Sequence, residues 1–206
     1  MWVVKLGGSL LGSPELPLWL DLFARHGDGN IVIVPGGGIF ADVVRESQKQ
    51  SGCSDVVAHR MAVLAMDQYG VLLAGLNPAL VTAESELEIA ERCWQHRTIV
   101  WLPSKMVCAD ENIPANWQLT SDSLAAWLAA KMNAEHLILI KSIKPKIGQL
   151  STERLMKDGV VDECFGDFTA GKNFNTWILG KEDCKAFSQH ISQKELNQVG
   201  LPVQYA

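Results

Sequence analysis

Short apolar runs rich in β-branched residues alternate along the chain with longer segments whose apolar residues recur at helical spacing. The apolar runs end in polar residues, Gly or Pro, and they occupy residues 2–6, 31–34, 98–102, 136–140 and 175–179. The longer segments predict helices over residues 15–26, 38–50, 55–76, 83–95, 122–133, 152–166 and 182–191. This alternation is typical of a mostly parallel sheet with helices on both faces. We therefore expect an α/β fold that forms a single domain over residues 1–206.

The least regular stretch is LPSKMVCADENIPANWQLTSD, which begins at Leu102 and carries two prolines among polar residues of little periodicity. We interpret it as a lid or a crossover between two parts of one domain, rather than as a linker. The alanine-rich SDSLAAWLAAKM that follows predicts a helix, with Thr120 or Ser121 as its N-cap.

Composition excludes several classes of protein. A hydrophobic content of 48% supports a large core, and a net charge of −5 argues against binding to nucleic acid or a membrane surface. The first apolar run is interrupted by Lys5 far short of a signal peptide or a membrane span. The five cysteines include no CxxC pair, which indicates reduced thiols rather than a zinc site or a disulfide framework. We expect a cytoplasmic protein.

Glycine-rich loops follow the first two predicted strands, as KLGGSL and as PGGG. Three consecutive glycines, Gly36 to Gly38, are more than a chain reversal needs, so we expect a close approach of backbone to a ligand. Ligands of open parallel sheets bind beyond the carboxyl ends of the strands, and a following helix N-terminus favours an anion. Neither loop matches GxGxxG or GxxxxGK[ST], which disfavours a Rossmann dehydrogenase and a P-loop ATPase. The pattern predicts two phosphate-binding loops.

Two charged residues stand near these loops. Lys5 lies two residues before Gly7 on an otherwise apolar strand. An unpaired ammonium in the core is costly, so we expect Lys5 to meet a phosphate at the end of the strand. The alternative is a lysine that reaches solvent from an edge strand. Asp122 begins the alanine-rich helix, where it has an alternative interpretation as a first-turn acidic residue that favours the helix dipole.

Four segments in order, VVKLGGSLL, IVIVPGGGIFADVVR, LTSDSLAAWLAAKM and HLILIKSI, resemble the amino acid kinase family, which includes acetylglutamate, aspartate, uridylate and isopentenyl phosphate kinases. The resemblance covers nearly the whole chain. It implies a three-layer αβα sandwich that binds Mg-ATP toward its C-terminal half and an acceptor toward its N-terminal half.

The resemblance also implies roles for the residues named above. Lys5 would contact the transferring phosphoryl group, and Asp122 would orient Lys5. Backbone N–H donors would come from the loops, with Gly7, Gly8 and Ser9 toward the phosphoryl group and Gly36, Gly37 and Gly38 toward the acceptor. Independently, phosphoryl transfer depends on positioning and charge neutralisation, which such donors supply.

The second lysine of many family members, in a GxxxK element, has no clear match in this chain. Its replacement is open among Lys141, Lys144, Lys146 and Lys172. Lys141 ends the strand HLILI, where a basic residue would meet ATP phosphates. Our prediction for nucleotide binding is Lys141, Ser142 and Lys146.

On the acceptor side, FADVVR and AHRMAVLAM look most like the small kinases of methanofuran-type cofactor synthesis, which add a second phosphate to an aminomethyl-furan methyl phosphate. In that interpretation Arg45 or His59 binds the acceptor phosphate, and Asp42 or Asp55 binds an ammonium. Each residue has a structural alternative: His59 as a packed or capping histidine, Arg45 on a solvated helix face and Asp42 early in a helix.

We therefore predict an ATP- and Mg²⁺-dependent small-molecule kinase whose acceptor is a phosphomonoester. No dedicated metal motif is visible, so Mg²⁺ is expected to arrive on the nucleotide phosphates. A carboxylate or carbamate kinase, and a nucleotide-binding storage or regulatory protein without turnover, are the alternatives. The long apolar helix after Asp55 is a candidate surface for a homodimer or higher homo-oligomer.

Overall fold

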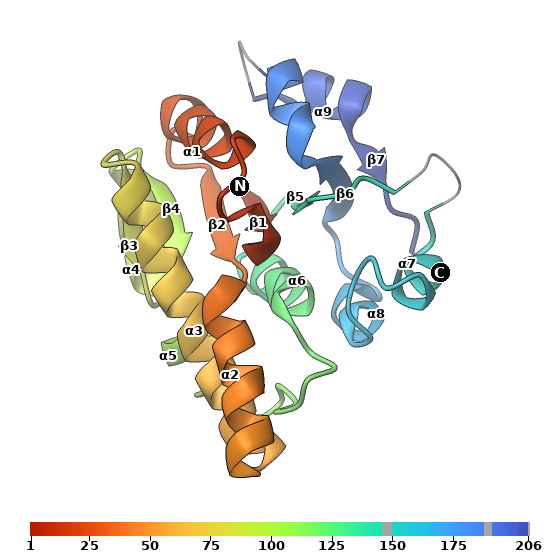
Figure 1. The fold of residues 1–206 in the computed structure, drawn as a ribbon. Coiled ribbons are helices and arrows are strands. Elements are labelled where there is room, and N and C mark those ends of the chain that lie inside the picture. Colours follow the sequence, from red (N-terminus) through yellow and green to blue (C-terminus); the bar gives the residue numbers. More distant parts are fainter. Residues whose placement is uncertain (146–149, 188–190, 206) are drawn as a thin grey trace.

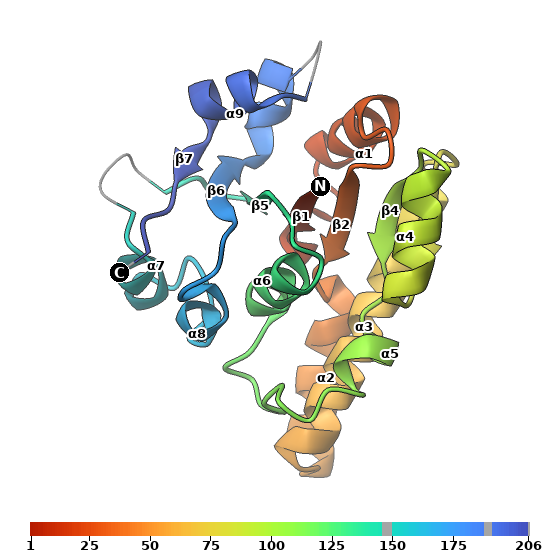
Figure 2. The same ribbon diagram turned by 180° about the vertical axis from the view of Figure 1, so that it is seen from behind.

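The computed structural model describes residues 1–145, 150–187 and 191–205. Within them the chain folds into a seven-stranded sheet with helices on both faces (Figures 1 and 2). The strand order is β3-β4-β2-β1-β5-β6-β7, and all neighbouring strands are parallel except β6 and β7. The strands are β1 (Trp2–Leu6), β2 (Ile31–Pro35), β3 (Leu80–Ala83), β4 (Thr98–Trp101), β5 (His136–Lys141), β6 (Asn175–Gly180) and β7 (Leu201–Pro202). The helices are η1 (Gly8–Leu10), α1 (Glu15–His26), α2 (Gly38–Ser51), α3 (Asp55–Leu76), α4 (Glu86–Trp94), α5 (Ser104–Val107), α6 (Ser121–Lys131), α7 (Thr152–Lys157), α8 (Phe165–Thr169), η2 (Lys181–Phe187) and α9 (Gln193–Val199). The predicted αβα sandwich is confirmed.

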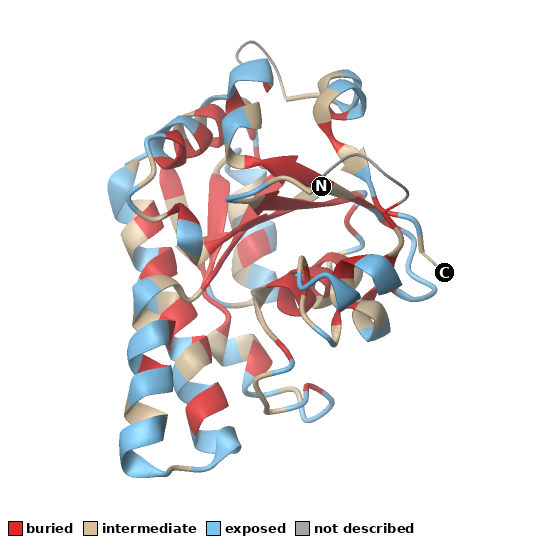
Figure 3. Cartoon of the chain, turned by 45° about the vertical axis from the view of Figure 1, so that its right-hand side comes forward, coloured by how far each residue is buried: buried red, intermediate tan, exposed pale blue. Residues whose placement is uncertain are grey.

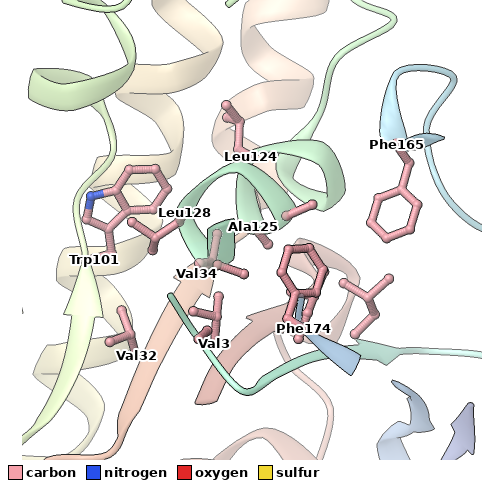
Figure 4. Close-up of a cluster of buried hydrophobic side chains, with 14 of the residues drawn as sticks. Val3, Val32, Val34, Trp101, Leu124, Ala125, Leu128, Phe165 and Phe174 are labelled. Atoms are coloured by element: carbon pink, nitrogen blue, oxygen red, sulfur yellow. The ribbon is translucent and has the colours of Figure 1, made fainter. Parts of the chain in front are cut away.

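Alternating residues of the central strands separate the core into two layers. On β1, Val3 packs with the cluster under α6, whereas Val4 packs with the cluster under α1. Because side chains of a strand point alternately to its two faces, Lys5 leaves β1 on the α6 side. Figure 3 shows the central strands buried along most of their length, and Figure 4 shows Leu128 of α6 close to Val34 of β2, with Val3 of β1 next to Val34. The fully apolar strands are therefore explained by helices that cover both faces.

The helices α2 and α3 form a hairpin that projects beyond the carboxyl ends of the strands (Figure 1). Gly52 ends α2 in the left-handed conformation, with φ of 68°. Ser54 is the N-cap residue of α3, since its side chain accepts a hydrogen bond from the backbone N–H of Val57. This sharp reversal places both helices beside the carboxyl ends of β1 and β2, where the glycine loops lie.

Three predictions of secondary structure are wrong in detail. The helix expected over 83–95 begins at Glu86, because β3, which the sequence analysis missed, occupies Leu80–Ala83. The helix expected over 152–166 is divided into α7 and α8, since Gly159 takes φ of 65° and the chain does not continue helically. The helix expected over 182–191 is instead η2, with α9 beginning only at Gln193, and residues 188–190 lie outside the described residues.

The two glycine loops pack directly on each other. A Cβ atom at Gly8 would lie 2.2 Å from the backbone nitrogen of Gly38, and one at Gly36 would lie 2.5 Å from the backbone nitrogen of Gly8. Gly38 also has a positive φ of 53°. We expected these glycines to let the backbone approach a ligand closely. The structure shows that they let the two loops approach each other closely.

We predict that Gly8→Ala lowers the free energy of unfolding by about 1–3 kcal/mol, because the added methyl group must push the two loops apart. Gly75→Ala in α3 is the control, since its Cβ would have no neighbour within 4 Å. The control should be neutral or stabilising by up to about 1 kcal/mol, as expected for glycine to alanine in a helix. Urea denaturation of both variants checks this, and equal midpoints would show that the loop contact imposes no constraint.

Candidate active site

The carboxylate of Asp122 lies between two lysines at the carboxyl ends of two central strands. The Oδ1 atom of Asp122 on α6 is 3.0 Å from Lys5 Nζ on β1, and Lys141 Nζ on β5 donates a hydrogen bond to Asp122 Oδ2 at 2.7 Å. The three side chains are each at most 13% exposed. Strands β1 and β5 are neighbours in the sheet, so the two lysines reach the same helix from adjacent strands. The structure thus brings Lys5 and Asp122 together as predicted, and it adds Lys141.

The charges in this cluster do not balance. Burial favours the neutral acid at Asp122, but the ammonium groups of Lys5 and Lys141 outweigh it and lower the pKa of the carboxyl group. Burial, together with the charge of Lys5, lowers the pKa of Lys141 to about 8, although Asp122 opposes the shift. One carboxylate lies within ion-pair distance of two ammonium groups, and the charge of Asp162 compensates Lys141 more weakly, so the contacts of the cluster leave positive charge in excess. An anionic oxygen, such as that of a phosphate, would compensate it.

The N-terminus of α6 is capped by a residue from a distant segment. Thr120 is the N-cap residue, as predicted, but its side chain makes no capping bond. Instead Asp162 accepts hydrogen bonds from the backbone N–H groups of Thr120 at 3.0 Å and Ser123 at 3.1 Å, and from both hydroxyl groups. Asp162 therefore sets the position of the helix that carries Asp122. Sequence analysis missed it, because a cap supplied about forty residues downstream leaves no local pattern.

A cavity of about 490 Å³ lies between the two glycine loops, the α2–α3 hairpin and residues 116–121. Its walls include both of the predicted phosphate-binding loops, through Gly8, Ser9, Gly36, Gly37 and Gly38. The first residues of α2 and α6, Gly38 and Ser121, also line it. Two helix N-termini thus face one cavity. That of α2 has no side-chain cap, which favours an anion there, whereas Asp162 already accepts from the backbone N–H groups of Thr120 and Ser123 at α6.

The lysine cluster does not itself line this cavity and lies beside it. Ser121, in the cavity wall, directly precedes Asp122. A Cβ atom at Gly7 would lie 3.5 Å from Lys5 Nζ, so the ammonium group of Lys5 borders the first glycine loop. The cavity and the excess positive charge are therefore neighbours at one edge of the sheet.

The predicted acceptor residues Asp42, Arg45 and His59 all line the cavity. Arg45 Nη1 donates a hydrogen bond to Asp42 Oδ1 at 2.7 Å, and both side chains are at least half exposed. Asp55 was the alternative to Asp42 for binding an ammonium group. It is not among the residues that line this cavity, and its carboxylate accepts a hydrogen bond from Gln48.

His59 is held against the irregular segment that follows α5. Its Nδ1 lies 3.3 Å from the carbonyl oxygen of Asn116, and because a carbonyl only accepts, Nδ1 carries the hydrogen. Burial lowers the pKa of His59, and the hydrogen bond to Asn116 only partly opposes this. A neutral His59 leaves Nε2 with a lone pair. To donate a hydrogen bond to a phosphate from Nε2, His59 must take up a proton.

The remaining candidates for nucleotide binding differ in what they contact. Lys144 Nζ lies 2.6 Å from both Asp183 Oδ2 and the carbonyl oxygen of Val199, which is a structural tie between segments. Ser142 and Lys172 are exposed, and Lys146 lies outside the described residues. Lys141 is thus the candidate lysine that the structure places in the cluster of Lys5 and Asp122.

Within residues 1–145, 150–187 and 191–205, no group of three or more His, Cys, Asp or Glu side chains is arranged to hold a metal ion. No helix in the described part of the chain has the length and apolar character needed to cross a membrane.

Comparison with known proteins supports a kinase. The model of the amino acid kinase family matches residues 1–145. A [5-(aminomethyl)furan-3-yl]methyl phosphate kinase of Methanocaldococcus jannaschii is 27% identical over 189 residues, which cover 91% of this chain and 78% of that protein. Uridylate kinase from Archaeoglobus fulgidus superposes with a TM-score of 0.70 at 18% identity, over 98% of this chain and 99% of that one. Aspartate kinase from Synechocystis superposes with a TM-score of 0.64 at 14% identity, over 88% of this chain and 38% of that one.

We predict that Asp122→Asn lowers the free energy of unfolding at pH 7 by about 3–5 kcal/mol, because it leaves two buried ammonium groups without a counter-charge. Asp42→Asn is the matched control, since it removes an aspartate from an exposed ion pair with Arg45. That change should cost less than about 1 kcal/mol. Chemical denaturation compares the two variants, and similar losses would mean that Asp122 does not hold the cluster together.

Proposed function

This chain belongs to the amino acid kinase family and is a phosphotransferase, and we propose that it transfers the γ-phosphoryl group of ATP to a small phosphomonoester. The observation that carries the proposal is the buried Lys5–Asp122–Lys141 cluster, which adjoins a cavity lined by two glycine loops and two helix N-termini. A phosphomonoester acceptor brings a dianion to a site that must also receive a phosphoryl group. Excess positive charge and backbone N–H donors are what such a site requires.

The residues of the cluster have separate tasks in this proposal. Asp122 holds Lys5 at 3.0 Å, so that the ammonium group stands at the first glycine loop, where charge develops during transfer. Lys141 supplies the second cation on the side of the C-terminal half, at the end of β5. ATP supplies the phosphoryl group when bound, and we propose that Mg²⁺ accompanies its phosphates. Catalysis then rests on positioning and on charge neutralisation.

The acceptor occupies the cavity with its phosphate at the glycine loops. There the backbone N–H groups of the first turn of α2, which has no side-chain cap, are available to its oxygen atoms. The organic part extends along α2 toward Asp42, Arg45 and His59. The relative from M. jannaschii is named for an acceptor with an aminomethyl group, and the carboxylate of Asp42 suits an ammonium. We therefore propose [5-(aminomethyl)furan-3-yl]methyl phosphate as the acceptor to test first.

We predict ATP-dependent ADP release with this acceptor, and slower or no release with acetate, carbamate, aspartate or glutamate. A coupled assay of the purified protein with each compound, with and without excess chelator, is the test. Turnover of a carboxylate but of no phosphomonoester would replace the proposal by the carboxylate kinase alternative.

In the same assay, Lys5→Ala should lower kcat by about 10²-fold or more, because it removes a cation that stabilises the transferring group. Lys157→Ala, at an exposed position on α7, is the control and should leave kcat unchanged.

We also propose that two copies associate through the outer face of α3. Exposed apolar side chains follow this helix at helical spacing, at Val57, Met61, Leu64 and Val71. On the opposite face, Val63, Met66, Tyr69 and Leu73 are buried. A helix that is apolar on both faces is expected to have a partner on each, and a second copy offers a self-complementary surface.

If this face is the interface, light scattering after size exclusion should give twice the mass of the chain for the wild type and the mass of one chain for Leu64→Lys. Leu87→Lys changes an exposed leucine on α4 and should leave the mass as in the wild type. A wild-type protein that elutes as a monomer at micromolar concentration would overturn this proposal.

A further inference from the structure

Residues 108–120 contain no helix or strand, and yet they form one wall of the cavity through Asn116, Trp117 and Leu119. Their placement depends on contacts with the α2–α3 hairpin. One of these is the hydrogen bond between His59 and Asn116 described above. The other contacts involve Trp117, which no motif of the sequence singled out.

The indole ring of Trp117 is fixed by a hydrogen-bonded relay. Its Nε1 donates to Gln48 Oε1 at 2.7 Å, and Gln48 Nε2 donates to Asp55 Oδ1 at 2.8 Å. Gln48 uses its oxygen toward one partner and its nitrogen toward the other, so its amide orientation is determined by both. Asp55, which we expected to bind an ammonium, instead anchors this relay.

Trp117 in turn contacts Arg45. The guanidinium carbon of Arg45 lies 4.9 Å from the centroid of the indole ring, which is a cation–π contact, and Asp42 holds the same guanidinium group from another side. Arg45 is seven residues after Gly38 on α2, about 10 Å along the helix. The guanidinium group is thus held in the cavity wall away from the glycine loops.

We propose that Trp117 is a positioning residue of the acceptor site: it holds the Arg45 guanidinium group, and Arg45 in turn fixes the Asp42 carboxylate where it meets the ammonium end of the acceptor, opposite the transferred group. The inference rests on the proposed function. Its surroundings set Trp117 apart from the other tryptophans: Trp101 is buried in the core, and Trp94 is 86% exposed on α4. Trp117 is partly buried and lines the cavity. It links residues 108–120 to α2 and α3, the three segments that meet at this wall.

The test measures KM for [5-(aminomethyl)furan-3-yl]methyl phosphate and for ATP in Trp117→Leu, with Trp94→Leu as the control. Trp117→Leu should raise the acceptor KM about fivefold or more, the size of one cation–π contact at a partly exposed site, without changing the ATP KM. Trp117→Phe keeps a ring beneath Arg45 and should restore most of the loss. Trp94→Leu should match the wild type. An unchanged acceptor KM in Trp117→Leu overturns the inference.

A double-mutant cycle separates positioning through Arg45 from a general effect on folding. In an Arg45→Met background, Trp117→Leu should raise the acceptor KM by less than twofold, because the group that Trp117 positions is already gone. An equal rise in both backgrounds overturns the inference. If the wild type turns over no phosphomonoester, it is the proposed function that fails. If the wild type is active and the cycle is additive, only the role of Trp117 fails.

Discussion

The ion-pair cluster of Asp122 with Lys5 and Lys141 is the constraint on which the site depends. Buried charges are tolerated only with close partners, so α6 must lie where its first turn meets the ends of both strands. That requirement also places the N-terminus of α6 at the cavity, and Asp162 fixes the helix there from a separate segment. Within ion-pair distance the two ammonium groups share one carboxylate, and Asp162 adds a weaker attraction to Lys141. The three side chains that hold α6 in place are thus the ones to which the proposed function assigns contact with phosphate groups.

Close packing of the glycine loops brings the acceptor side within reach of this charge. Because Gly8 and Gly38 meet backbone to backbone, the starts of η1 and α2 stand side by side at the sheet edge. Farther along α2, the polar residues of the cavity are already engaged, Arg45 with Asp42 and Trp117, and His59 with Asn116. An acceptor must match or exchange these contacts. In the proposed function, selectivity would therefore rest on the hairpin, and charge stabilisation on the residues at the ends of the strands.

The sequence by itself determined the layered fold and the residues of the sheet edge. Apolar runs and helical periodicity report burial directly, so the strands β1, β2, β4, β5 and β6 and helices such as α3, over 55–76, were predicted with their bounds nearly as observed. The order of the glycine loops, Lys5 and Asp122 along the chain identified the family, which the match over residues 1–145 shows. The strand β3 was missed, because its four residues Leu80–Ala83 run directly into the segment with helical periodicity and were not distinguished from the start of that helix.

Only the tertiary structure decided which distant residues complete the site. Lys141 could not be chosen over its neighbours by local pattern, since its role depends on the distance from its Nζ to Asp122, 19 positions earlier. Asp162 and Trp117 gave no signal for the same reason: one caps a helix from about forty residues away, and the other donates to Gln48 across 69 positions. Periodicity encodes which side of an element is buried. Which side chains then meet depends on how strands, loops and helices are packed in space.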